Sequence, residues 1–428
     1  MKPFVVAIDG PAGAGKSTTA RGVAQRLGLL HVDSGAMYRI AAWLATRERI
    51  PLEDEARIVA LVSAARFEPS SDGMRVNGAD VGDLIRTAEA GEAASRVAVL
   101  PGLRRRLVAV QRSFARPPGL VIEGRDIGTV VFPDADLKLF VSASPESRAE
   151  RRSLELRAKG QDPGREAVLE ATRERDRRDT ERDVSPLSRA PDAILLDTTR
   201  LQPDEQVDLA AHWASLARAH PDRPGINYTI GKSVVQAFAH AFLDFHPERA
   251  HSVPRNGPVI VACNHISFWD PPLVGAAIRR EMHYIAKAEL FHNPLFGRML
   301  RSYNCIPIQR GTRARTGLKG AEEVLREGGG VVIFPEGTRN KSGSLIPARA
   351  GVARLAAVTR TPIVPAYISG SNRIRRSMLR QVPIRITFGS PVMPPRLESD
   401  REELRSFAQS VMEMIAALRE EQGTTSWK

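Results

Sequence analysis

Short apolar runs and amphipathic segments alternate along the chain in two separate blocks. In the first block, the runs with the length of buried strands are 4–8, 120–122, 137–141 and 195–199. The segment 17–27 has the pattern of a helix. Alternating strands and helices predict an α/β domain, a parallel sheet with helices on both faces. Around 66–81 a hairpin turned by Asn77-Gly78 is predicted as a small insert over about 64–90.

The second block repeats this α/β alternation after a segment rich in turn residues, 220–225. Its strand-like runs are 259–262, 331–334, 363–367 and 384–388. An amphipathic helix is expected over 401–421. The chain is too long for one ordinary core, so two domains are predicted, 1–218 and 227–428, joined by a linker at 219–226.

Apolar and aromatic residues recur at helical spacing at the start of the second block. They are Ile230, Val234, Val235, Phe238, Phe242 and Phe245. Such a stripe has two interpretations, either packing in the core or docking on a membrane surface. The pattern alone does not choose between them.

Composition narrows the choice of partners and compartment. A net charge of +13 favours anionic partners, namely nucleotides, anionic lipid headgroups or nucleic acid. The two cysteines, Cys263 and Cys305, cannot build a disulfide framework, which fits a reducing cytoplasm. No long uncharged apolar stretch predicts a transmembrane span, so any membrane contact is expected to be peripheral.

A phosphate-binding loop lies between the first predicted strand and the first predicted helix. The pattern GxxxxGK[ST] is complete from Gly10 to Ser17, in the strand–loop–helix context that makes it specific. Its backbone amides are expected to hold ATP, with Lys16 reaching the transferred phosphoryl group and Ser17 holding Mg²⁺. The predicted ATP-binding residues are Gly10, Pro11, Ala12, Gly13, Ala14, Gly15, Lys16, Ser17 and Thr18.

Further blocks identify the acceptor. The N-terminal part, over about 1–215, resembles the bacterial cytidylate kinases. The matching stretches are 8–18, 33–39, 76–78 with 85–87, 123–128, and 175–176 with Asp179, Arg182 and 185–187. The resemblance implies the fold of P-loop nucleoside monophosphate kinases and phosphorylation of CMP or dCMP by ATP with Mg²⁺.

The same resemblance implies a role for each matching residue. Residues implied to read the cytosine are Ser34, Ser95, Arg104 and Asp126, those to hold the ribose are Arg175 and Asp179, and those to clamp the monophosphate are Arg39, Arg125 and Arg182. Arginine suits phosphate because its planar fork binds two oxygens and stays charged. The arginine-dense stretch 146–189 is therefore a candidate lid; a merely solvated helix face is the alternative.

A second site is predicted where Asp270 follows His265 by five residues. This spacing suits a strand ending at Cys263, a turn carrying His265 and a helix that Asp270 caps, with Pro271 as its first residue. Taken alone, the pattern favours an ordinary helix cap beside a chance histidine.

Three further blocks give this pair a context. They are Arg310 after the run 305–309, Phe-Pro-Glu-Gly-Thr-Arg at 334–339, and 361–365. Together the four blocks resemble the glycerolipid acyltransferase family over about 226–400, which implies an α/β acyltransferase domain. Pro307 departs from the usual apolar run before Arg310.

The chemistry expected of the second site is acyl transfer from a thioester to a hydroxyl. His265 would be the general base and Asp270 would fix its orientation, with the substrate hydroxyl as nucleophile. Residues implied to bind the acceptor's phosphate are Arg310, Glu336, Gly337, Thr338 and Arg339. Acyl-CoA or acyl carrier protein would be the cosubstrate, with no bound cofactor.

These expectations describe a bifunctional enzyme that phosphorylates CMP or dCMP and converts 1-acylglycerol 3-phosphate into phosphatidic acid. The presence of both activities in one chain suggests the hypothesis that the kinase recycles CMP released in phospholipid synthesis. Alternatives for the second domain are a non-catalytic lipid-binding tether, or an acyltransferase for glycerol 3-phosphate or another lysolipid. No nucleic-acid-reading motif and no obligate protein partner is evident. The expected location is the cytoplasm, at the inner face of the membrane.

Overall fold

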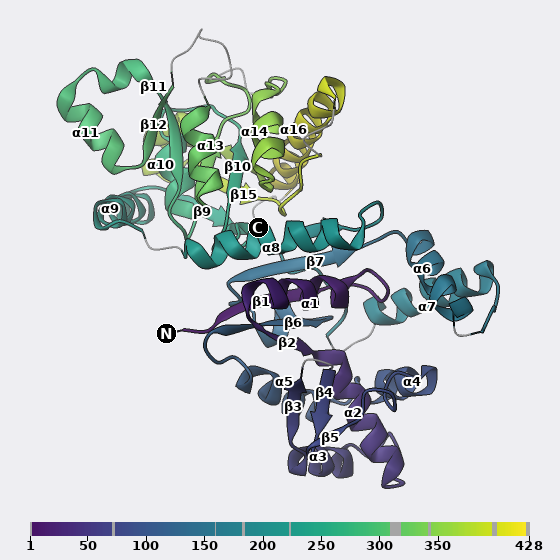
Figure 1. Cartoon of the computed structure of the whole chain (residues 1–428). Helices are drawn as coiled ribbons and strands as arrows, with labels where there is room; N and C mark the ends of the chain where they lie inside the picture. Colours follow the sequence, from purple (N-terminus) through teal and green to yellow (C-terminus); the bar gives the residue numbers. More distant parts are fainter. Residues whose placement is uncertain are drawn as a thin grey trace. The chain divides into compact units, whose positions relative to one another are not determined.

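The computed structural model describes residues 2–70, 73–158, 160–181, 185–221, 224–308, 318–340, 344–395 and 400–424. The chain divides into two compact units (Figure 1). Unit 1 comprises Met1–Ala190 and Leu195–Ser215, and unit 2 comprises Pro191–Ile194 and Leu216–Lys428.

Unit 1 is built on a five-stranded sheet of order β2-β6-β1-β7-β8. The strands are β1 Phe4–Asp9, β2 Leu30–Asp33, β6 Gly119–Gly124, β7 Leu137–Ser142 and β8 Ile194–Asp197. Strand β1 pairs in parallel with β6 and β7, and β2 pairs in parallel with β6. Val5 and Ala7 pack into one hydrophobic cluster, whereas Val6 and Ile8 are buried on the opposite face. Both faces are therefore covered, which confirms the predicted sheet.

The helices of unit 1 are α1 Lys16–Leu27, α2 Ser34–Arg47, α3 Glu55–Ala64, α4 Ala88–Val97, α5 Pro101–Ser113, α6 Pro145–Ala158, α7 Arg165–Glu181 and α8 Pro203–Ala219, with a π-helical turn η1 at Ile127–Val131. A separate antiparallel sheet of order β3-β4-β5 comprises Phe67–Ser70, Gly73–Val76 and Ala79–Asp80. Asn77-Gly78, both with positive φ, turn β4 into β5.

Unit 2 holds a seven-stranded sheet of order β12-β11-β13-β10-β14-β15-β9. The strands are β9 Phe245–Glu248, β10 Val259–Cys263, β11 His283–Lys287, β12 Cys305–Ile308, β13 Gly330–Ile333, β14 Ile363–Ser369 and β15 Ile384–Phe388. Strand β10 pairs in parallel with both β13 and β14. The loops that follow these three strands therefore leave the same edge of the sheet, where the second candidate site lies.

The helices of unit 2 are α9 Ile226–Phe242, α10 Asp270–Ala277, α11 Pro294–Ser302, α13 Lys319–Arg326, α14 Gly351–Thr359, α15 Ile374–Met378 and α16 Arg401–Thr424, with 3₁₀ turns η2 Ala250–Ser252, η3 Ala288–Phe291 and η4 Ser371–Arg373. Val259 and Val261 face a cluster containing residues of α9 and α10, and Ile260 and Ala262 face one containing residues of α13, α14 and α16. In Figure 1, α9 and α10 lie to the left of this sheet, and α14 and α16 lie to its right.

The apolar stripe of α9 divides into two faces. Tyr228 and Ala239 are buried against the unit, with Phe238 half-buried beside them. Ile230 and Val234 instead remain about three-fifths exposed, at 58% and 62%. The helical spacing placed Phe245 on the same helix, but this residue lies outside it. The chain becomes extended after Phe242, and Phe245 begins β9, where its ring is buried in the sheet.

Candidate functional sites

The phosphate-binding loop follows β1 and enters α1 with a backbone that requires glycine. Gly10 has φ of 147°, and a Cβ there would lie 1.9 Å from the carbonyl oxygen of Val141. Gly15, the residue before α1, has φ of 91°. Because Gly15 has no side chain to cap α1, phosphate oxygens can approach the first amides of this helix. The loop is thus shaped for close approach of an anion to the backbone.

Lys16 and Asp9 are buried charges beside this loop. The ammonium of Lys16 donates to the carbonyl of Pro11 at 2.7 Å. Burial, and then the nearby Arg125, lower the pKa of Lys16 to about 7. Burial raises the pKa of Asp9 to about 6, although its carboxylate accepts hydrogen bonds from the amides of Ile127 and Gly128, both at 2.7 Å. Asp9 thereby ties the start of the phosphate loop to the turn after β6.

Nucleotide binding is expected to draw a proton onto Lys16. Bound phosphates bring negative charge beside the ammonium and raise its pKa from about 7. At pH 8 ATP binding should therefore take up about one proton, and ATP affinity should fall up to tenfold per pH unit above this pH. Calorimetry in buffers of different ionisation enthalpy measures this uptake. A binding enthalpy that is the same in all buffers would contradict it.

Ser17 and Glu123 place oxygen ligands next to the loop. The hydroxyl of Ser17 donates to Glu123 Oε2 at 2.7 Å, and Glu123 Oε1 lies 3.1 Å from His31 Nε2. Hydroxyl and carboxylate oxygens beside phosphates fit Mg²⁺, which prefers such hard ligands. Sequence reasoning assigned no role to Glu123. Its position at the end of the buried strand β6 was the available signal.

Most residues predicted to bind CMP pair with one another or with nearby loops. Arg104 and Asp126 form a buried ion pair, and Arg125 Nε donates to Asp179 Oδ2 at 3.0 Å. Another Arg125 nitrogen donates to the Gly10 carbonyl at 3.1 Å. This guanidinium therefore joins the phosphate loop to α7, the arginine-rich helix that the sequence marked as a candidate lid.

The remaining predicted residues differ in their surroundings. Ser34 donates to the Glu123 carbonyl at 2.7 Å, and Arg39 donates to Asp33 at 2.7 Å. On α7 the side chain of Arg175 is exposed, and partial loss of water around its guanidinium, followed by the nearby charge of Arg125, lowers its pKa. Ser95 lies exposed on α4, where its hydroxyl donates to the carbonyl of Gly91 in its own helix at 3.1 Å. Arg182 lies outside the described residues.

Arg148 is a buried arginine at the phosphate loop that sequence reasoning did not single out. Its guanidinium donates to the carbonyl of Ala12 at 3.2 Å and to Asp176 of α7 at 2.8 Å. The side chain is only 3% exposed. Arg148 therefore makes a second link between the loop and α7. One arginine in an arginine-dense helix carries no distinguishing signal in the sequence.

In unit 2, His265 and Asp270 are in direct contact. Nδ1 of His265 lies 2.8 Å from Asp270 Oδ2, and the same oxygen accepts the amides of Ile266 and Ser267, both at 2.7 Å. Asp270 is fully buried, at 0% exposure. The predicted cap is wrong in detail, because α10 begins at Asp270 itself and the carboxylate binds the preceding turn. This geometry places the Nδ1 proton toward Asp270 and leaves Nε2 available as a base.

Glu336 holds the same turn from the neighbouring strand. Its Oε1 accepts the amide of His265 at 3.0 Å and its Oε2 accepts the amide of Ile346 at 3.4 Å. The ring of Phe334 stacks on His265 with centroids 4.1 Å apart. Of the other predicted acceptor residues, Gly337 is half-buried in the turn after Glu336, and Thr338 and Arg339 are exposed. Arg310 lies outside the described residues.

Both cysteines of unit 2 are protonated thiols near neutral pH. Burial raises the pKa of Cys263 well above its usual range and raises the pKa of Cys305 to about 11. Since a thiolate is the reactive form, neither side chain is suited to act as a nucleophile. The base that this site offers is His265.

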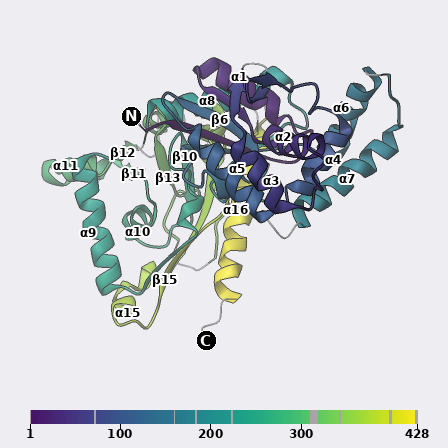
Figure 2. The same cartoon turned by 90° about the horizontal axis from the view of Figure 1, so that it is seen from below.

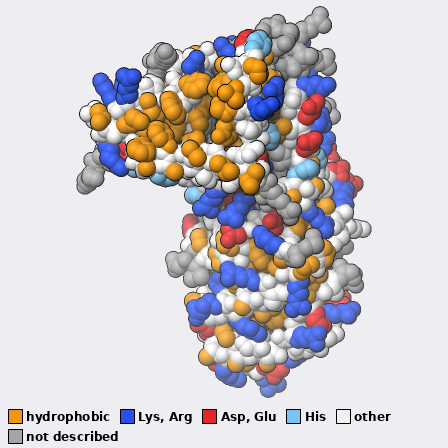
Figure 3. All heavy atoms as spheres, turned by 90° about the vertical axis from the view of Figure 1, so that its left-hand side faces the viewer, with side chains coloured by type: hydrophobic (Ala, Val, Ile, Leu, Met, Phe, Trp, Pro, Cys, Tyr) orange, Lys and Arg blue, Asp and Glu red, His pale blue; other side chains and the backbone are white. Residues whose placement is uncertain are grey.

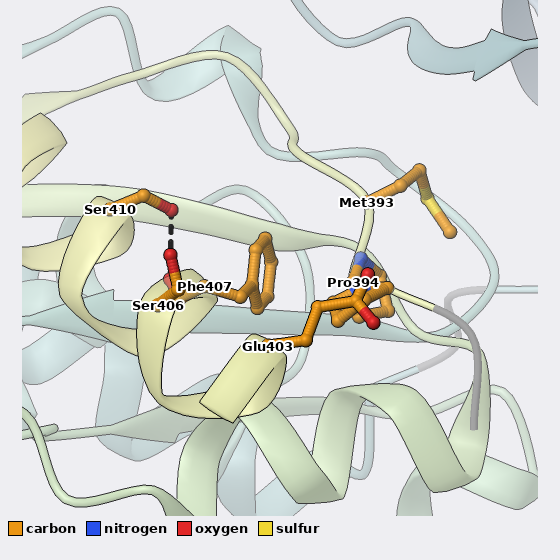
Figure 4. Close-up of a pocket in the computed structure, with 7 residues that line it drawn as sticks. Met393, Pro394, Glu403, Ser406, Phe407 and Ser410 are labelled. Atoms are coloured by element: carbon orange, nitrogen blue, oxygen red, sulfur yellow. Dashed lines mark hydrogen bonds between the residues drawn. The ribbon is translucent and has the colours of Figure 1, made fainter. Parts of the chain in front are cut away.

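The described part of unit 2 includes two hollows that differ in their lining. The larger, about 380 Å³, is lined by Met393, Pro394, Pro395, Glu403, Ser406, Phe407 and Ser410 (Figure 4). Glu403 is its single charged lining residue, which does not suit a phosphate-bearing substrate. The smaller, about 190 Å³, includes Asn264 and Ile266 on either side of His265, together with Glu336. The smaller hollow adjoins the histidine turn, whereas no residue of that turn lines the larger one.

Comparisons with known proteins agree with the division of the chain into two units. Residues 6–215 match the cytidylate kinase family model, and residues 245–369 match the acyltransferase family model. A cytidylate kinase of Solibacter usitatus is 48% identical over 203 residues, which are 47% of this chain and 88% of that protein. One from Cereibacter sphaeroides is 49% identical over 217 residues, which are 50% of this chain and 97% of that protein. The chain therefore belongs to the cytidylate kinase family and carries an acyltransferase domain after the kinase.

Among solved structures, the chain is similar to the 1-acyl-sn-glycerophosphate acyltransferase PlsC of Thermotoga maritima. The identity is 27%, the match covers 51% of this chain and 83% of that one, and the TM-score is 0.39. In the described part of the chain, no helix is both long and apolar enough to cross a membrane.

Proposed function

We propose that the chain is a bifunctional enzyme, which phosphorylates CMP and dCMP in unit 1 and acylates 1-acylglycerol 3-phosphate in unit 2. The kinase class follows from the family match, and the proposal extends it to the substrates and residues. For the acyltransferase, the proposal rests mainly on the contact between His265 and the buried Asp270.

In the kinase, the chain's own residues position phosphates and neutralise their charge. Lys16 would contact the transferred phosphoryl group, and Arg39, Arg125 and Arg182 would hold the monophosphate of CMP. The Arg104–Asp126 pair would offer both donors and acceptors to the cytosine edge. Mg²⁺, held by the Ser17 hydroxyl and the phosphates, would neutralise charge that builds up during transfer.

In the acyltransferase, His265 Nε2 would accept the proton of the sn-2 hydroxyl as its oxygen attacks the thioester carbonyl. The C–S bond then breaks, an ester forms, and the imidazolium returns the proton to the departing thiolate. Asp270 keeps the Nδ1 proton in place and stabilises the transient positive charge. This step uses no side-chain nucleophile, in keeping with the protonated cysteines.

The acceptor's phosphate would bind beside the turn at Gly337, with Thr338, Arg339 and Arg310 supplying donors and charge. A panel of acceptors tests this assignment in the full-length protein. Activity with lysophosphatidate above that with glycerol 3-phosphate or uncharged lysolipids supports it. Equal activity without the phosphate would contradict it, and acylation of none of them would point to a lipid-binding tether.

We also propose that unit 2 works at a membrane surface. Ile226, Ile230, Val234 and Phe242 leave one face of α9 exposed, and Phe268 and Trp269 are exposed within the turn between His265 and Asp270. Figure 3 shows hydrophobic side chains gathered over this face of unit 2, with Lys and Arg at its border. An apolar face with a basic border fits an anionic bilayer, where a lysophospholipid resides.

Helix α15 extends this surface. It is tied to the end of α9, because the amide of Asp244 donates to Ser377 Oγ at 3.1 Å, and Figure 2 shows the two elements close together. Met378 and Leu379 are exposed at its end, next to exposed Arg375 and Arg376. Apolar and basic side chains therefore lie side by side where this surface would meet lipid headgroups.

Placing charge on the exposed face of α9 should release the protein from membranes. The double variant Ile230→Glu with Val234→Glu is expected to lower binding to anionic vesicles at least tenfold, because two carboxylates would have to enter the interface. Co-sedimentation with phosphatidylglycerol vesicles measures this. Leu154→Glu, at an exposed apolar position on α6 of the kinase, is the matched control. Equal loss in both variants, or none in the double variant, would contradict membrane docking through α9.

A further inference from the structure

The second carboxylate oxygen of Asp270, Oδ1, has a partner in the turn after β14. The hydroxyl of Ser371 donates to Asp270 Oδ1 at 2.5 Å, whereas His265 and two backbone amides share Oδ2. Ser371 is 1% exposed and Asp270 is 0% exposed. The contact is therefore sealed from water on both sides.

We propose that Ser371 is a positioning residue of the acyltransferase, a third member of the hydrogen-bonded chain Ser371–Asp270–His265. The inference rests on the proposed acyl transfer by His265. A carboxylate without water must be satisfied by protein donors, and Ser371 is the donor to Oδ1. By holding Oδ1, Ser371 stops the carboxylate from rotating about its Cβ–Cγ bond, so that Oδ2 keeps facing His265.

The fold presents Ser371 at this point through a constrained turn. Gly370 directly follows β14 and has a φ of 78°. A Cβ there would lie 2.1 Å from the carbonyl oxygen of Pro383. The chain then enters η4, whose first residue is Ser371. Because β14 is paired with β10, this turn lies beside the turn that carries His265. The loops after β13 and β14 therefore support the histidine turn after β10, through Glu336 and Ser371.

A positioning role predicts different results from a purely structural one. Ser371→Ala should lower kcat for acyl transfer about tenfold, the range for losing a hydrogen bond to a charged group, and change KM less than twofold. Ser371→Thr retains the hydroxyl and should recover most of the rate. The matched control is Thr387→Val. Thr387 is 1% exposed on β15, and its hydroxyl also donates to a carboxylate, but that carboxylate is Glu248, at 2.9 Å, rather than Asp270.

A spectroscopic readout separates this inference from the proposed activity. In NMR spectra of the full-length protein labelled with ¹⁵N-histidine, assigned by comparison with His265→Ala, the Nδ1 proton of His265 should appear strongly downfield. It should move upfield or broaden in Ser371→Ala and stay unchanged in Thr387→Val. CMP phosphorylation in the same samples normalises each preparation.

The results have distinct meanings. Loss of rate and of the downfield proton in Ser371→Ala, with rescue by threonine, supports the inference. An unchanged rate and resonance in Ser371→Ala, or an equal change in Thr387→Val, would overturn it. If the wild-type protein acylates no lysolipid, the proposed function fails, and the resonance still decides whether Ser371 positions the pair.

Discussion

Replacing His265 by alanine is expected to lower acyl transfer to lysophosphatidate about 10³-fold and to leave CMP phosphorylation unchanged. General-base catalysis contributes about 10²–10⁴-fold, and in this site His265 is the group that Asp270, Glu336 and Phe334 all hold in place. The rates are measured on one preparation, with radiolabelled acyl-CoA for the first reaction and a coupled ADP assay for the second.

The chain offers a matched control for this change. His246 Nε2 lies 2.7 Å from Asp244 Oδ1, a second His–Asp pair in unit 2 away from the predicted site. His246→Ala should retain acyl transfer within about twofold, since surface ion pairs contribute little. Equal losses in the two variants would mean that His265 acts through stability rather than chemistry. More than a tenth of the activity left in His265→Ala would exclude it as the base.

Replacing Lys16 by methionine is expected to have opposite effects on catalysis and stability. Removing a preorganised cation from the transferred phosphoryl group should lower CMP phosphorylation about 10³-fold. The same change removes a buried ammonium surrounded by Arg125 and Arg175, so the Tm of the nucleotide-free protein should rise by about 3 °C. Turnover and differential scanning calorimetry measure the two effects.

The pKa of Lys16 also determines how the stability of the folded protein changes with pH. Folding lowers the pKa of Lys16 from 10.5 to about 7, so the unfolded chain binds the extra proton between these values. Lys16 therefore makes the folded state more stable as the pH rises from about 7 to 10.5. Lys16→Met should flatten this rise, whereas Lys2→Met, at an exposed lysine paired with Asp136, should not. A Tm that falls in Lys16→Met at pH 7 would contradict a destabilising ammonium.

The sequence predicted the elements of both sites where the signal is local. The phosphate loop lies within eight residues, so its spacing indicated a site directly. Five residues separate His265 from Asp270, and this spacing indicated a site only together with the neighbouring blocks. The parallel sheet of unit 1 followed from apolar runs between helical segments. The mistaken cap at Asp270 has the same local origin, because a carboxylate before a helix more often binds the helix than the turn ahead of it.

Groups brought together by strand pairing were not predictable in this way. Glu123 meets Ser17 across 106 residues, and Ser371 meets Asp270 across 101 residues. A lone glutamate or serine has no periodicity to mark it, and only the register of the sheet places it. The stripe on α9 shows a related limit. Helical spacing identified its apolar residues, but which of them stay exposed depends on how the helix packs.

We propose that one chain carries two independent active sites. The most direct test assays CMP phosphorylation and lysophosphatidate acylation on full-length wild type, Lys16→Met and His265→Ala. The wild type should catalyse both reactions, Lys16→Met only acyl transfer, and His265→Ala only phosphorylation. A wild type without acyl transfer, or either variant losing both activities while still folded, would contradict the claim.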